Sequence, residues 1–121
     1  MDIIPDKSIT LVQLRVKNEE FNNKSYTAMS NWLALKGYDG ASKLWKKYAE
    51  DELIHKGWAV DFLSNLNILP IEQAQEQPQT EFKGLPQIIA LSYQRELQTT
   101  KESQELAKVS LDEGQVTRNL K

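Results

Sequence analysis

A long polar segment in the middle of the chain constrains the fold more than any other feature. Residues 67–84, "NILPIEQAQEQPQTEFKG", are rich in Gln and Glu and contain Pro70 and Pro78, which cannot continue a helix. An extended connector of about 17 residues reaches ~55 Å, more than the ~39 Å length of a 26-residue helix. A helix that follows this connector can therefore begin beside the start of the preceding helix and run parallel to it.

Two helical patterns precede the connector. The first begins at about Pro5 and runs to about Lys36, where "KGYDGA" (36–41) interrupts it with two glycines. Asp39 is the expected N-cap of the second pattern, which runs over about 41–66. A turn this short makes the first two helices antiparallel neighbours.

A third helical pattern follows the connector and begins near Leu85, with Pro86 in its first turn. We expect Gly114 in "DEG" to end this helix as a C-cap, which leaves a short polar tail at 115–121. The predicted fold class is therefore all-α, a bundle containing three long helices.

Composition excludes several classes of protein. The 121 residues predict one domain, and a net charge of −2 with mixed signs gives no electrostatic footprint for nucleic acid. The absence of Cys excludes disulfides, thiolate metal sites and cysteine nucleophiles. With no basic apolar signal segment and no run of roughly 18 apolar residues, we expect a cytoplasmic protein that does not cross a membrane.

Positions spaced alternately by three and four residues define the expected inner face of each helix. In the first helix they are Val12, Val16, Glu19, Asn23, Tyr26, Ser30 and Leu33. In the second helix they are Ala41, Trp45, Tyr48, Glu52, His55, Ala59, Phe62 and Leu66. In the third helix they are Leu85, Ile89, Tyr93, Glu96, Thr100 and then Leu106 or Ala107.

Each helix thus turns one carboxylate inward: Glu19, Glu52 and Glu96, with His55, the only histidine, three residues after Glu52. Three buried carboxylates would repel one another and resist ionisation, and a bound cation would remove both problems. Carboxylate and imidazole ligands without thiolate suit iron, manganese or zinc. The competing interpretation is that Glu-x-x-His arose by chance, with His55 a hydrogen-bonded boundary residue and the carboxylates facing water.

A long crossover after the second helix is typical of ferritin-like bundles and of cytokine bundles. From about residue 7 to residue 111 the sequence also resembles the bacterial-type ferritins. The matching features are Glu19 followed by Tyr26 seven residues later, Trp32, the loop "DGA" (39–41), the block "AEDELIH" (49–55), and Glu96 in "YQRELQTT".

The resemblance implies a role for each candidate residue. Glu19, Glu52 and His55 would bind a first iron, with Glu52 bridging to a second iron that Glu96 helps to bind. Tyr26 would hydrogen-bond a ligand or donate an electron, although a packed tyrosine with a satisfied hydroxyl is an equally good interpretation. The implied function is iron storage with ferroxidase activity, the oxidation of Fe(II) to Fe(III), in a 24-subunit shell.

The sequence departs from this family in one respect. Ferritins have a fourth long helix that supplies further ligands, and here "DEGQVTRNLK" stands about where that helix should begin. We expect residues 1–121 to form a single ferritin-like domain without it, whose open face is covered by a second copy, a ferritin subunit or a separately encoded segment. The alternative function is a non-catalytic interaction protein that pairs with itself or with ferritin subunits through this face.

Overall fold

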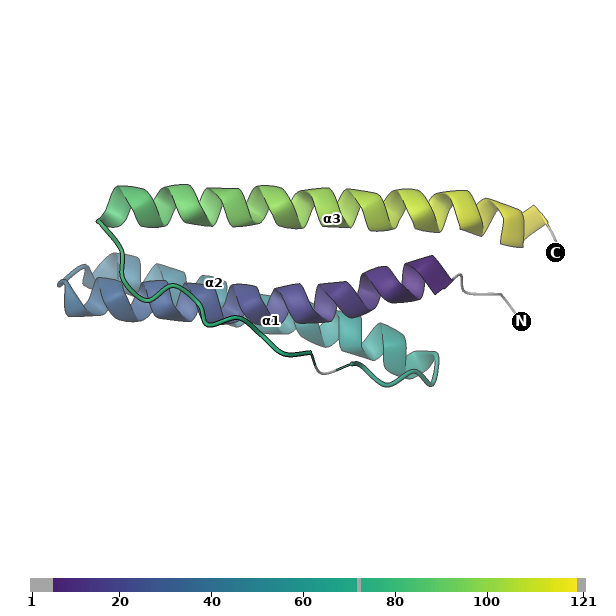
Figure 1. Cartoon of the computed structure of the whole chain (residues 1–121), viewed down its shortest axis with the longest axis horizontal. Coiled ribbons are helices and arrows are strands. Elements are labelled where there is room, and N and C mark those ends of the chain that lie inside the picture. The colour runs from purple at the N-terminus through teal and green to yellow at the C-terminus, as the bar shows by residue number, and fades with distance from the viewer. Residues whose placement is uncertain (1–5, 72, 120–121) are drawn as a thin grey trace.

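The structure, a computed structural model that describes residues 6–71 and 73–119, confirms the all-α prediction. The described residues form three helices and no strand: α1 (Asp6–Leu35), α2 (Asp39–Asn65) and α3 (Leu85–Asn119). α1 and α2 are antiparallel neighbours, and α3 runs parallel to α2 (Figure 1). No helix within 6–71 or 73–119 combines the length and apolar character that a membrane crossing requires.

The turn between α1 and α2 depends on one glycine. Gly37 adopts a φ of 83°, and its N–H donates to the Ala34 carbonyl, while the Tyr38 N–H donates to the Leu33 carbonyl at 2.9 Å. This is the Schellman arrangement, which favours glycine because its central residue is left-handed. The prediction of Asp39 as N-cap was wrong by one residue, because Tyr38 occupies that position and makes no side-chain capping hydrogen bond. Asp39 is the first residue of the helix, where its negative charge interacts favourably with the helix dipole.

The connector follows α1 back to the start of α3, as the crossover prediction requires (Figure 1). Gln13 of α1 holds its first part, because Nε2 donates to the Leu69 carbonyl at 3.0 Å and Oε1 accepts from the Ile71 N–H at 2.8 Å. Further along, Gln75 Nε2 donates to the Lys17 carbonyl at 3.1 Å. Gln13 of α1 thus satisfies connector backbone groups that would otherwise be left unpaired, and Gln75 attaches the connector to α1.

α1 is the central helix of the three. It packs against both α2 and α3, whereas no Cα atoms of α2 and α3 lie within 8 Å of each other in the described residues. The larger core cluster consists of Tyr26, Met29, Trp32, Leu33, Trp45, Ala49 and Ile88. A second cluster, toward the start of α1 and the end of α2, consists of Val12, Val16 and Leu63.

Two predictions about the third helix were wrong. Its inner face is shifted by one residue, since Ile88 is fully buried while Ile89 and Tyr93 are 52% and 65% exposed. The reason is that α3 packs mainly on α1, so the predicted line of residues lies beside the space between α2 and α3. The helix also continues through Gly114 to Asn119, because a glycine inside a helix costs only about 1 kcal/mol and does not force an end.

Candidate metal centre

Three of the predicted ligands lie together between α1 and α2. Glu19 comes from the middle of α1, and Glu52 and His55 are one turn apart on the facing side of α2. One ligand atom from each residue lies within 4.8 Å of the others. His55 Nδ1 is 3.5 Å from a carboxylate oxygen of Glu19 and 3.5 Å from one of Glu52. This grouping has the size and the donor types of a metal site.

The two carboxylates are deeply buried. Glu19 is 0% and Glu52 is 4% exposed, and apart from the ion pair of Glu19 with Arg15, neither oxygen of Glu19 nor Oε2 of Glu52 has a hydrogen-bond partner among the described residues. Burial and the neighbouring carboxylate of Glu19 raise the pKa of Glu52 to about 9. Carboxylate oxygens held this way favour a cation beside them or a proton on one of them.

A basic residue lies on the same side of α1. The guanidinium of Arg15, one turn before Glu19, forms an ion pair with it, and its Nη1 is 3.7 Å from Oε2 of Glu102 on α3. Sequence analysis missed Arg15, although its position four residues before an inward Glu was the available signal, because residues so spaced are neighbours on a helix.

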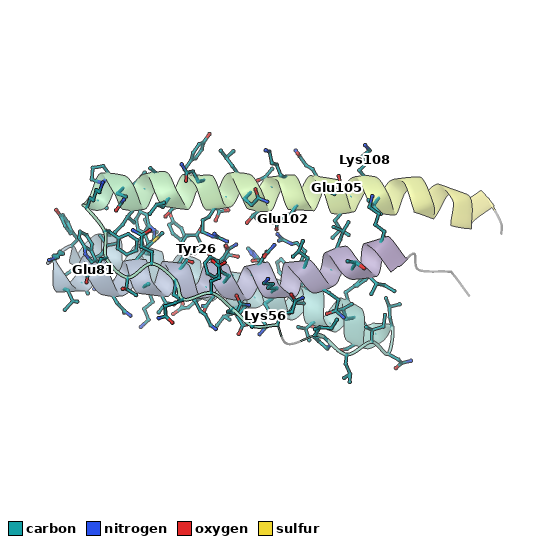
Figure 2. All side chains as sticks on the ribbon, viewed as in Figure 1. Tyr26, Lys56, Glu81, Glu102, Glu105 and Lys108 are labelled. Atoms are coloured by element: carbon teal, nitrogen blue, oxygen red, sulfur yellow. The ribbon has the colours of Figure 1, made fainter. Side chains whose placement is uncertain are left out.

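Tyr26 and Glu96 form a separate pair next to these ligands. The Tyr26 hydroxyl donates to Glu96 Oε1 at 2.5 Å, and Tyr26 lies between α1 and α3 (Figure 2). Burial, together with the hydrogen bond to Glu96, raises the pKa of the Tyr26 phenol. Glu96 itself is exposed and is not a member of the three-residue group.

An open groove connects the two sets of residues. Its volume is about 460 Å³, and Glu52, His55, Tyr26 and Glu96 all line it. Its other lining residues are Trp45, Tyr48, Asp51, Ile89, Ser92 and Tyr93. All of the predicted site residues therefore lie in the close group, along this groove, or in both.

Asn22 is a further buried polar residue that the sequence analysis did not single out. Its Nδ2 donates to Thr99 Oγ1 at 3.2 Å, and its Oδ1 accepts from Arg95 Nε at 2.5 Å. The pattern of three- and four-residue steps selected Asn23 at this point of α1, and Asn23 instead donates to the Ala49 carbonyl at 2.7 Å. These bonds fix α1 against both neighbouring helices around the ligand group.

Comparison with known families decides what kind of protein this bundle is. Residues 16–120 match the ferritin family, described as a ferritin-like domain. The chain belongs to the ferritin family. Among its curated relatives, a probable bacterial non-heme ferritin-like protein of Haemophilus influenzae is 24% identical over 111 residues, covering 92% of this chain. A bacterial non-heme ferritin of Escherichia coli is 26% identical over 99 residues, covering 78% of this chain.

Solved ferritins share the fold. An open-pore ferritin from the archaeon Archaeoglobus fulgidus superposes with a TM-score of 0.87 at 23% identity, covering 98% of this chain and 74% of that one. Chlorobium tepidum ferritin superposes with a TM-score of 0.88 at 21% identity, covering 96% and 71%. The ferritin-like bundle predicted from the sequence is thereby confirmed. This chain spans 67% of the Haemophilus relative and 60% of the Escherichia coli one.

Proposed function

We propose that this ferritin-like chain binds Fe(II) as its cargo through Glu19, Glu52 and His55. The observation that carries the proposal is the group of ligand atoms within 4.8 Å, which contains buried carboxylate oxygens without hydrogen-bond partners. Arg15 compensates the charge of Glu19, and a bound dication would compensate the further carboxylate charge that appears when Glu52 ionises. Membership of the ferritin family supports iron as the metal and iron storage as the general role.

The chemistry of each ligand fits this proposal. Carboxylate oxygens are hard ligands that favour Fe(III) as well as Fe(II), and imidazole binds iron readily. Glu52, whose pKa is raised to about 9, would lose its proton when the metal binds, so binding should release protons near neutral pH. Affinity should therefore fall as the pH is lowered.

We extend the proposal to a second iron and to oxidation. Glu52 would bridge to a second ion that Glu96 helps to bind across the groove both residues line. Tyr26, hydrogen-bonded to Glu96, would orient that carboxylate or donate an electron. Two Fe(II) ions oxidised to Fe(III) release two electrons, which with two protons reduce O2 to hydrogen peroxide.

The iron-binding proposal is tested by size-exclusion chromatography with in-line iron detection after anaerobic loading with Fe(II). We expect iron to co-elute with the wild type and to be lost from Glu52→Ala/His55→Ala. Glu50→Gln, on an exposed position of the same helix, is the matched control and should retain iron. If all three proteins elute without iron, the proposal is wrong.

Oxidation needs a separate measurement, the consumption of O2 after air is admitted to the Fe(II)-loaded protein. We expect consumption of about one O2 for every two Fe(II) ions. Uptake should be slower in Glu96→Gln, because a neutral amide replaces the carboxylate that would bind the second iron. Iron retention without O2 uptake would leave binding in place and reject the ferroxidase activity.

The second candidate function is a non-catalytic interaction protein that pairs with itself or with ferritin subunits. The observation in its favour is a set of exposed large apolar residues: Ile89 and Tyr93 line the groove, and Trp58 and Phe62 line a second pocket that shares His55 with it. Contiguous exposed apolar surface is typical of interaction sites. Oligomers that persist in Glu52→Ala/His55→Ala, with no iron bound by the wild type, would favour this function.

A further inference from the structure

Arg15 occupies an unusual place for a cation. Its side chain is only 16% exposed, its guanidinium pairs with the buried Glu19, and its Nη1 is buried without a hydrogen-bond partner among the described residues. Glu19 is at the same time one of the three grouped ligands. A fixed positive charge thus lies against an atom that the proposed metal would bind.

The guanidinium and a metal ion compete for the same carboxylate. In the metal-free protein Arg15 supplies the positive charge that the buried Glu19 requires. A dication bound to Glu19 would repel the guanidinium at close range and would take its share of the carboxylate charge. Metal binding is therefore more favourable if the guanidinium has another anion to approach.

Glu102 is the anion within reach. Its Oε2 is 3.7 Å from Arg15 Nη1, and its side chain is also only 16% exposed. Asn18 Nδ2 donates to Glu102 Oε2 at 2.9 Å and Gln98 Nε2 donates to Oε1 at 3.2 Å, so the carboxylate is held in position from α1 and from α3. Arg15 thus has one carboxylate on each side, only one of which is a grouped ligand.

We propose that Arg15 is a built-in counter-cation of the metal centre, which holds Glu19 in the metal-free protein and transfers to Glu102 when a divalent cation binds. This inference rests on the proposed function and adds a regulatory residue pair to it. Arg15 lowers the affinity of the site and stabilises its empty form, and Glu102 offsets part of that loss. Both are positioning residues, since neither is required to touch the metal.

The test is a double-mutant cycle measured by calorimetric titration of the metal-free protein with Zn²⁺, which does not change oxidation state. Arg15→Gln should bind Zn²⁺ roughly tenfold or more tightly, because one like charge beside the dication is removed. Glu102→Gln should bind it several-fold more weakly. The loss of Zn²⁺ affinity caused by Glu102→Gln should disappear in the Arg15→Gln background, because that variant has no guanidinium to pair with Glu102.

The Lys7–Glu105 ion pair, 3.7 Å long, also joins α1 to α3 and supplies matched controls. Lys7→Gln and Glu105→Gln make the same charge changes and should shift Zn²⁺ affinity much less than the Arg15 and Glu102 substitutions. Arg15→Lys keeps the charge and should not bind more tightly than wild type. Equal effects in the two pairs, or a Glu102→Gln effect that persists without Arg15, would overturn the inference.

Failure of this inference can be told from failure of the proposed function. If the wild type binds Zn²⁺, Glu52→Ala/His55→Ala does not, and the cycle is additive, only the role of Arg15 is rejected. If neither wild type nor Arg15→Gln binds Zn²⁺, the metal centre itself is rejected. If Arg15→Gln does not fold, as judged by its helical circular dichroism, Glu102→Gln against Glu105→Gln decides: a weaker affinity only in the former supports the inference, and equal affinities overturn it.

Discussion

The hydroxyl of Tyr26 donates a 2.5 Å hydrogen bond to Oε1 of Glu96 and so joins the middle of α1 to α3. The donor is fully buried, while the acceptor lies at the edge of the groove that Glu52 and His55 also line. One bond thus connects the packing of the bundle with the position of a carboxylate proposed to bind metal.

Replacing Tyr26 with Phe should lower the free energy of unfolding by roughly 1–3 kcal/mol, because a hydrogen bond to a carboxylate is lost while the ring remains. Urea denaturation followed by circular dichroism measures this. Tyr48→Phe, at a partly exposed tyrosine whose ring lies edge-on to Tyr26, is the matched control and should change it by less than about 0.5 kcal/mol. Equal losses in the two variants would contradict a structural role for the Tyr26–Glu96 bond.

The metal-free protein should become less stable as the pH rises from about 5 to about 9. Burial and Glu19 raise the pKa of Glu52 from 4.5 to about 9, so in this interval the folded state binds a proton that the unfolded state has released. The free energy of unfolding should fall with rising pH by up to about 1.4 kcal/mol per pH unit.

Urea denaturation at a series of pH values in the presence of a chelator measures this slope. Glu52→Gln, which mimics the protonated side chain, should flatten it. A wild-type stability that increases between pH 5 and pH 9 would be inconsistent with a protonated Glu52.

Divalent metal should stabilise the folded chain. At a free Zn²⁺ concentration of 100 times the dissociation constant, linkage predicts a gain of about 2.7 kcal/mol, visible as a higher melting temperature in a calorimetric scan. Glu19→Gln should abolish the increase because it removes a buried ligand oxygen. A melting temperature that rises equally in Glu19→Gln would place the bound metal elsewhere.

Truncating Leu33 should destabilise the protein much more than truncating Leu35. Leu33 is 0% exposed within the larger core cluster, and Leu35 is 84% exposed at the end of the helix. Leu33→Ala should cost roughly 2–5 kcal/mol of unfolding free energy through lost burial and a cavity, whereas Leu35→Ala should cost less than about 0.5 kcal/mol. Chemical denaturation of the two variants in parallel measures the difference, and similar costs would contradict the packing.

Much of this bundle could be predicted from local signals. Gly37 at the turn and the prolines of the connector are sufficient to bound the helices, because backbone chemistry restricts these positions whatever the tertiary contacts. Glu19, Glu52 and His55 could be grouped because steps of three and four residues place side chains on one face of a helix. In the structure, ligand atoms of these three residues lie within 4.8 Å of one another.

The inner face of α3 could not be predicted in the same way. Ile88 and Ile89 are adjacent and equally apolar, so either can begin a line of inward residues, and only the position of α1 selects Ile88. Arg15 was missed for a related reason. From sequence alone, a basic residue within a helix is assigned to the exposed face unless its partner is known to be buried. Both cases depend on tertiary contacts, which a one-dimensional pattern does not contain.

The central position of α1 sets the order in which the molecule opens. Within the described residues α3 packs mainly on α1 and meets α2 through the Trp45 Nε1–Ser92 Oγ hydrogen bond of 2.9 Å, so it can detach while the α1–α2 hairpin stays intact. Backbone amides of α3 should therefore exchange with solvent through a local opening, at lower free energy than those of α1, whose protection requires global unfolding. The connector, bound to α1 through Gln13, would tether the detached α3, so that α3 rebinds α1 of the same chain.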